Sequence, residues 1–123
     1  MKRLWLVLLL LLGVLFIQHE SQDISRLLIE AKPTQLQDGA QLRARQMVKY
    51  PQQIECFNHI INKESHWNPY ARNGSHYGLG QMRSMWYGQL DAVRQVEATV
   101  VYITYRYHSS CEAWAFHQRH GWY

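Results

Sequence analysis

Several classes of protein are excluded by what this sequence lacks. It contains no helix-turn-helix, zinc-finger or glycine-rich phosphate-binding pattern, although its formal net charge is +4 and its isoelectric point is about 9.2. It has only two cysteines, and its seven histidines do not fall at the spacing of zinc ligands. Internal repeats and strand-like alternation are also missing. We therefore expect no nucleic acid, metal or cofactor, and the basic charge instead suits anionic cell-wall polymers or phospholipid headgroups.

The longest apolar run lies at the N-terminus. Residues 4–17 are uninterrupted by polar side chains and follow Lys2 and Arg3, which is the layout of an export signal or a short membrane anchor. As a helix this run would span about 21 Å, less than the ~30 Å hydrocarbon core, which favours a signal peptide. Residues 18–22 offer no cleavage pattern of small residues, which favours an uncleaved anchor. We expect residues 1–20 to be a transmembrane anchor or signal segment, with the rest outside the cytoplasm.

The segment after the apolar run is polar and mixed. One short apolar stripe at helical spacing runs from Ile24 to Ala31 and ends at Pro33, and later apolar residues recur less regularly. We interpret residues 21–49 as a stalk or linker that leads to a domain over residues 50–123. For residues 40–50 an alternative stays open, in which they form the first helix of that domain.

A helix that ends with a carboxylate is predicted after Tyr50-Pro51, since proline suits the first turn of a helix. Its expected face is formed by Cys56, Phe57, Ile60, Ile61 and Glu64. Pro69 disfavours helical geometry in the residue before it, so the helix should end near Asn68. Apolar surroundings favour the protonated form of a carboxyl group, which makes Glu64 a candidate general acid.

Loop and helix signals complete the chain. Residues 73–75 and 78–80 contain glycines that allow close backbone approach to a ligand, so Glu64 should face a glycine-lined cleft. Further helices are predicted from the N-cap Asp91 to about residue 107, and over about 111–119 before a terminating glycine. No strand pattern competes, and the predicted fold class is mostly α.

Short motifs in the second half of the chain occur in a specific order. They are Glu64-Ser65, Trp67-Asn68-Pro69, Ala71 and Tyr77-Gly78-Leu79-Gly80-Gln81-Met82. These stretches resemble the E-S, N-P-x-A and G-L-x-Q signatures of the lytic transglycosylase (SLT-like) domain of the lysozyme-like superfamily. The segment from Tyr102 to Tyr123 is similar to the ending of small exported members from bacteria and their phages. The resemblance covers roughly residues 50–123 and implies a small, helical, lysozyme-like domain.

The resemblance implies a chemistry for Glu64. In this family a single glutamate protonates the glycosidic oxygen between N-acetylmuramic acid and N-acetylglucosamine in peptidoglycan. Glycosidases normally use two carboxylates unless the substrate assists, and no other acidic residue of this chain has a comparable setting. Glu64 would then take a proton from the muramoyl C6 hydroxyl, closing a 1,6-anhydro ring. The alternatives are a muramidase that uses water at the same site, a non-catalytic peptidoglycan-binding module and a basic membrane-bound scaffold.

The resemblance also assigns residues to substrate binding. Gln81 would contact the sugar next to the cut, and Tyr77 and Tyr102 would line the saccharide cleft. Ser65 would bond the Glu64 carboxyl or the muramoyl group, and Tyr102 has the alternative of positioning that carboxyl. Purely structural roles stay open for all four. For His117, where relatives carry a polar or aromatic residue, a place at the cleft edge stays open.

The expectation of export bears on whether the two cysteines form a disulfide. In an oxidising compartment, a disulfide between Cys56 and Cys111 would tie the start of the Glu64 helix to the C-terminal segment. The alternative is a cytosolic protein with two buried free thiols. We expect a location in the periplasm or at the cell wall. The resemblance fits a wall-remodelling enzyme, an accessory that opens the wall locally for secretion or conjugation, and a phage lysis or virion-associated enzyme.

Overall fold

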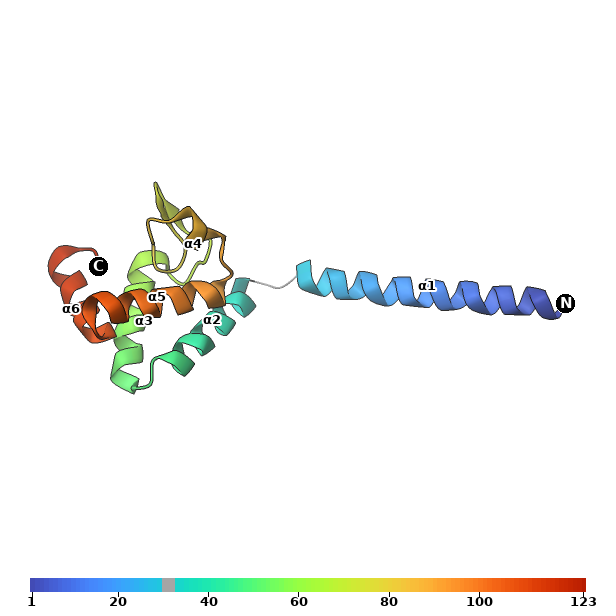
Figure 1. The fold of residues 1–123 in the computed structure, drawn as a ribbon, viewed down its shortest axis with the longest axis horizontal. Coiled ribbons are helices and arrows are strands. Elements are labelled where there is room, and N and C mark those ends of the chain that lie inside the picture. Colours follow the sequence, from blue (N-terminus) through green and yellow to red (C-terminus); the bar gives the residue numbers. More distant parts are fainter. Residues whose placement is uncertain (30–32) are drawn as a thin grey trace. The chain divides into compact units, whose positions relative to one another are not determined.

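The chain consists of two compact units, Met1–Lys32 and Pro33–Tyr123. The computed structural model describes residues 1–29 and 33–123, without the side chains of residues 2, 20, 23–29 and 33. The first unit contains helix α1 (Lys2–Ile29) (Figure 1). The second contains α2 (Pro33–Met47), α3 (Pro51–Ser65), β1 (Arg72–Asn73), β2 (His76–Tyr77), α4 (Met85–Gln89), α5 (Ala92–Tyr107) and α6 (Ser110–His120). The prediction of a mostly helical chain is confirmed.

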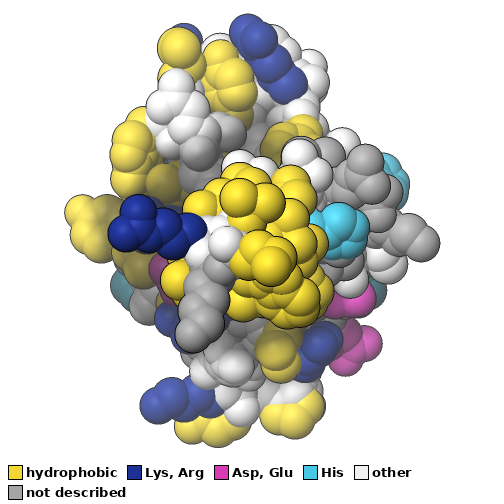
Figure 2. All heavy atoms as spheres, turned by 90° about the vertical axis from the view of Figure 1, so that its right-hand side faces the viewer, with side chains coloured by type: hydrophobic (Ala, Val, Ile, Leu, Met, Phe, Trp, Pro, Cys, Tyr) yellow, Lys and Arg dark blue, Asp and Glu magenta, His cyan; other side chains and the backbone are white. Residues whose placement is uncertain are grey.

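Helix α1 is apolar around its whole circumference in its first half. The large apolar side chains from Leu4 to Ile17 each expose more than half of their surface. Figure 2 shows hydrophobic side chains gathered over this helix. Among the residues that the structure describes, no helix has both the length and the apolar character needed to cross a membrane. The expected transmembrane anchor at residues 4–17 is therefore not supported.

The helical domain begins at residue 33 and not near residue 50. Helix α2 packs along α5, and both Ala40 and Ala44 are completely buried there. Small side chains one turn apart allow two helices to approach closely. The stalk expected over residues 21–49 is thus a packed helix from residue 33 to residue 47. The alternative of a first domain helix describes this region better, although that helix starts earlier than residue 40.

Helix α3 has the predicted start but an earlier end. Tyr50 is extended and Pro51 is the first helical residue. The helix stops at Ser65, because His66 and Trp67 both adopt left-handed backbone angles, with φ of 51° and 60°. Trp67 is buried next to Phe57, with 6.1 Å between ring centroids. The helix therefore ends one residue after Glu64, which is earlier than the predicted end near Asn68.

The later helices agree with their predicted bounds. Asp91 caps α5 by accepting a hydrogen bond from the Arg94 backbone nitrogen at 2.9 Å. Gly121 ends α6 with φ of 77°. The sequence did not predict the short antiparallel hairpin of β1 and β2, in which each strand has two residues. Strands of this length are too short to show an alternating pattern.

A disulfide links helices α3 and α6. Cys56 on α3 is bonded to Cys111 on α6, with 5.0 Å between their Cα atoms, so the predicted pairing is confirmed. The backbone nitrogen of Cys111 also donates to the Gln53 side chain at 2.9 Å. These two links hold the first turn of α6 against the first half of α3.

We expect loss of this disulfide to destabilise the domain markedly. The bond closes a loop of 55 residues, and the chain-entropy estimate for such a loop is about 3–4 kcal/mol. Urea unfolding of the full chain, with and without reductant, measures this difference, and a Cys56→Ser, Cys111→Ser variant should match the reduced protein. An unfolding free energy unchanged by both treatments would contradict the prediction.

Candidate functional site

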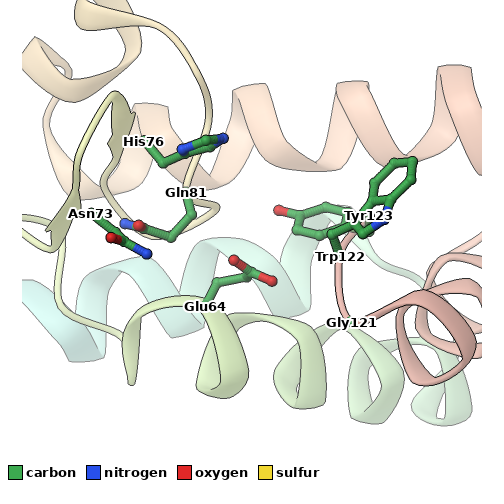
Figure 3. Close-up of a pocket in the computed structure, with 7 residues that line it drawn as sticks. All are labelled: Glu64, Asn73, His76, Gln81, Gly121, Trp122 and Tyr123. Atoms are coloured by element: carbon green, nitrogen blue, oxygen red, sulfur yellow. The ribbon is translucent and has the colours of Figure 1, made fainter.

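A cavity of about 320 Å³ lies above the C-terminal end of α3 (Figure 3). It is lined by Glu64, Asn73, His76, Gln81, Gly121, Trp122 and Tyr123. These residues come from the end of α3, the hairpin, the glycine loop and the segment after α6. In Figure 3 the Glu64 carboxyl points up into the space between Gln81 and Tyr123. Among the described side chains that line the cavity, Glu64 alone carries a carboxyl group.

Glu64 is held by a histidine from α6. Its Oε1 lies 2.7 Å from Nε2 of His117, which is 53 residues away in sequence. The Glu64 and His117 side chains expose only 18% and 10% of their surface. The carboxyl group therefore sits in a largely desolvated site with one oxygen already bonded. The resemblance proposed Ser65 or Tyr102 as its partner, but the contact in the structure comes from His117.

Three residues expected to bind substrate lie outside the cavity. The Ser65 hydroxyl is buried and donates to the Ile61 carbonyl oxygen at 3.2 Å. The Tyr77 ring lies under the Arg72 guanidinium, 5.1 Å from its centroid. Tyr102 lines a separate groove on α5, and its hydroxyl accepts a 3.3 Å hydrogen bond from the side chain of the arginine one turn later. These placements match the structural roles that the sequence left open.

Gln81 is the predicted substrate-binding residue that does line the cavity. Its Nε2 donates to the carbonyl oxygens of Gly78 and Ala71, at 2.9 and 3.2 Å. Both N–H groups of the amide are therefore used, and Oε1 remains as an acceptor. The residue also has a left-handed backbone, with φ of 47°. Gln81 thus braces the loop with one end of its amide and keeps an oxygen for a ligand.

Buried polar side chains of α5 fix the loop that carries Gln81. Oε1 of Gln95 accepts from the Leu79 nitrogen at 2.8 Å, and its Nε2 donates to the carbonyls of Pro69 and Leu90 at 3.1 and 2.9 Å. Gln95 is only 1% exposed. One side chain therefore ties both ends and the middle of the loop to α5. The sequence did not predict this role of Gln95, although a glutamine on the apolar face of a helix was a detectable signal.

A second set of hydrogen bonds passes through Tyr87. Its hydroxyl accepts from the Gly80 nitrogen at 2.8 Å and lies 2.8 Å from Oγ1 of Thr99. Because Thr99 gives its only proton to the Gln95 carbonyl at 2.7 Å, Tyr87 must be the donor to Thr99. Burial raises the pKa of Tyr87 to about 12, so it remains a neutral donor at physiological pH.

Gly80 lies at the meeting point of three hydroxyl groups. Its carbonyl accepts from the Tyr123 hydroxyl at 2.9 Å. A Cβ at this position would lie 2.7 Å from the Thr99 hydroxyl, 2.9 Å from that of Tyr123 and 3.0 Å from that of Tyr87. The cluster of hydroxyl groups explains why glycine is required here.

Tyr123 links this cluster to the cavity. Burial, the neighbouring Tyr87 and the neighbouring Glu64 hold its pKa well above the usual range. It therefore stays protonated and donates to Gly80 under ordinary conditions. Its ring also packs near His117, with 6.2 Å between centroids. The last residue of the chain thus contacts both the loop and the partner of Glu64.

Comparison with known proteins identifies no relative. No protein-family model matches the chain, and no curated protein or solved structure shows a significant match. Within the described part of the chain, no group of three His, Cys, Asp or Glu side chains is arranged to hold a metal ion. The resemblance to lytic transglycosylases therefore remains a hypothesis.

We expect Gly80→Ala to destabilise the domain by about 1–3 kcal/mol, because the added methyl group overlaps three hydroxyl groups. Gly39→Ala is the matched control, since Gly39 lies within α2 with no atom near its absent Cβ. This control should gain about 0.5–1 kcal/mol from helix propensity. Urea unfolding of both variants measures the two effects. A Gly80→Ala protein as stable as the wild type would show that the loop is not packed as described.

Proposed function

We propose that this protein is a peptidoglycan lytic transglycosylase that cleaves the β-1,4 bond between N-acetylmuramic acid and N-acetylglucosamine. The main support is the setting of Glu64, a mostly buried carboxyl group at the end of a rigid helix that opens into a polar cavity. A general acid requires this combination of restricted solvent and access to the substrate. The motif order in residues 64–82 points to the same chemistry.

The single carboxyl group favours a substrate-assisted route. Glycosidases with two protein carboxylates place both at the scissile bond, whereas among the described side chains that line this cavity Glu64 alone has a carboxyl group. Glu97 is bonded to Arg43 at 2.8 Å, and Asp91 caps α5. The N-acetyl group of the muramoyl residue would therefore stabilise C1 after Glu64 protonates the leaving oxygen. Glu64 would then accept the C6 hydroxyl proton as that oxygen attacks C1, giving a 1,6-anhydro product without consuming water.

The other lining residues suit a saccharide. Trp122 exposes about half of its surface, at 51%, and offers an aromatic face on which a sugar ring can stack. Gln81 keeps its amide oxygen as an acceptor, and Asn73 and His76 add polar groups from the hairpin. Such a mixture of one aromatic face and several hydrogen-bonding groups favours a glycan ligand over an apolar one.

The disulfide favours a location outside the cytoplasm. Disulfides persist in oxidising compartments such as the periplasm and the cell exterior, where peptidoglycan also lies. Cys56 and Cys111 are bonded, and no free cysteine is present among the described residues. We propose that residues 4–17 act in export, with the domain working at the cell wall as a cellular or phage-encoded enzyme.

We expect Glu64→Gln to abolish cleavage of purified peptidoglycan. The amide cannot donate the required proton, so the rate should fall at least ~100-fold. Full-length wild type, Glu64→Gln and the control Glu55→Gln, which alters an exposed carboxylate on the same helix, are compared by mass spectrometry of released muropeptides. Wild type and control should both release 1,6-anhydro ends.

The products separate this proposal from its alternatives. Reducing ends in place of anhydro ends would identify a muramidase. Retained glycan binding without any products would identify a binding module. Full activity of Glu64→Gln would contradict the assigned role of Glu64.

A further inference from the structure

We propose that His117 is the positioning residue of this site: it donates a hydrogen bond from Nε2 to Oε1 of Glu64, so that the transferable proton stays on Oε2. This inference rests on the proposed function. The two atoms are 2.7 Å apart, a short distance for a nitrogen and oxygen pair, and both side chains are largely shielded from water. His117 itself is not among the residues that line the cavity. It therefore acts through Glu64 and not on the substrate.

The direction of this hydrogen bond decides where the acidic proton sits. If Nε2 carried no hydrogen, it would accept the proton of the carboxylic acid, which would then lie on Oε1 and be engaged with His117 in place of the substrate. With hydrogen on Nε2, Oε1 accepts and the acid proton is left on Oε2. After proton transfer both oxygens of Glu64 can only accept, so the same N–H bonds the carboxylate. A single tautomer of His117 thus suits both stages of the reaction.

The same bond should favour the transition state. As Glu64 gives up its proton, negative charge develops on both carboxyl oxygens. A hydrogen bond to a charged oxygen is about twice as strong as one to a neutral oxygen. The contact from His117 therefore strengthens as the glycosidic bond breaks, which lowers the barrier without tightening substrate binding.

The fold holds His117 firmly in this position. Its ring lies between Trp114 and Tyr123, with centroid distances of 5.5 and 6.2 Å. The disulfide between Cys56 and Cys111 also holds α6 against α3, at positions that precede Glu64 and His117 on the same two helices. A preformed donor of this kind loses little freedom when the reaction occurs, as electrostatic preorganisation requires.

Few other titratable groups face the pair. His76 on the hairpin and Tyr123 line the same cavity, and His59 on α3 reaches the pair only through Trp114, on which it stacks at 5.2 Å. Burial, with Tyr87 and Glu64 nearby, keeps the pKa of Tyr123 well above its usual range, so this residue does not add a charge near neutrality.

The test compares two replacements of His117 in the full-length protein, using soluble muramoyl oligosaccharides as substrate. His117→Phe keeps an aromatic ring but has no donor, and kcat should fall ~10- to 100-fold with KM within about twofold. His117→Gln keeps an N–H group and should recover much of kcat, with a pH–rate profile that differs from that of the wild type because glutamine does not ionise. His120→Phe, at an exposed position one turn later, is the control and should behave as the wild type.

Several outcomes would overturn the inference. These are a wild-type kcat in His117→Phe, equal loss of kcat in the Phe and Gln variants, and an unchanged pH–rate profile in His117→Gln. Thermal unfolding shows whether each variant is folded, and if His117→Phe is not, the profile of His117→Gln decides. A wild-type protein without cleavage activity would overturn the proposed function, and this inference with it. An active wild type together with an unaffected His117→Phe variant would overturn the inference alone.

Discussion

The side-chain amide of Gln95 is the constraint on which the cavity depends. It bonds the backbone at Pro69, Leu79 and Leu90, so one buried group on α5 fixes the start, middle and end of the loop opposite Glu64. Each of these backbone groups would cost about 1–3 kcal/mol if buried without a partner. Leu79 adds an apolar anchor to these hydrogen bonds, since its side chain is completely buried in the hydrophobic core. The position of Gln81 over the carboxyl group follows from this arrangement.

Local features of the sequence predicted much of the fold. Pro51, Asp91 and Gly121 mark helix ends through backbone geometry that each residue carries wherever it occurs, and the observed helices begin or end beside them. The disulfide was predicted from the expectation of export and the presence of only two cysteines. Glu64 was singled out because it ends an apolar helical face, and it does line a cavity. These inferences needed only neighbours along the chain or simple counting.

Features that depend on distant residues were not predictable in the same way. Helix α2 is anchored by Ala40 and Ala44, whose small side chains give almost no apolar pattern but allow close packing. The contact between Glu64 and His117 joins residues 53 positions apart, and nothing in their spacing indicates it. Tyr102 is a third case, since the resemblance implied a place in the cleft, whereas in the structure its side chain lines a groove on α5. All three features depend on how the helices pack in the folded domain, which short sequence patterns do not show.

The most direct measurement of the central claim is the crystal structure of the Glu64→Gln protein with a bound muramoyl oligosaccharide. We expect a glycan chain through the cavity, with the scissile oxygen within hydrogen-bonding distance of the side chain at position 64. We also expect a contact from the sugar to Oε1 of Gln81, which its two backbone bonds leave available. A glycan bound elsewhere on the domain, with the cavity occupied only by water, would contradict the account.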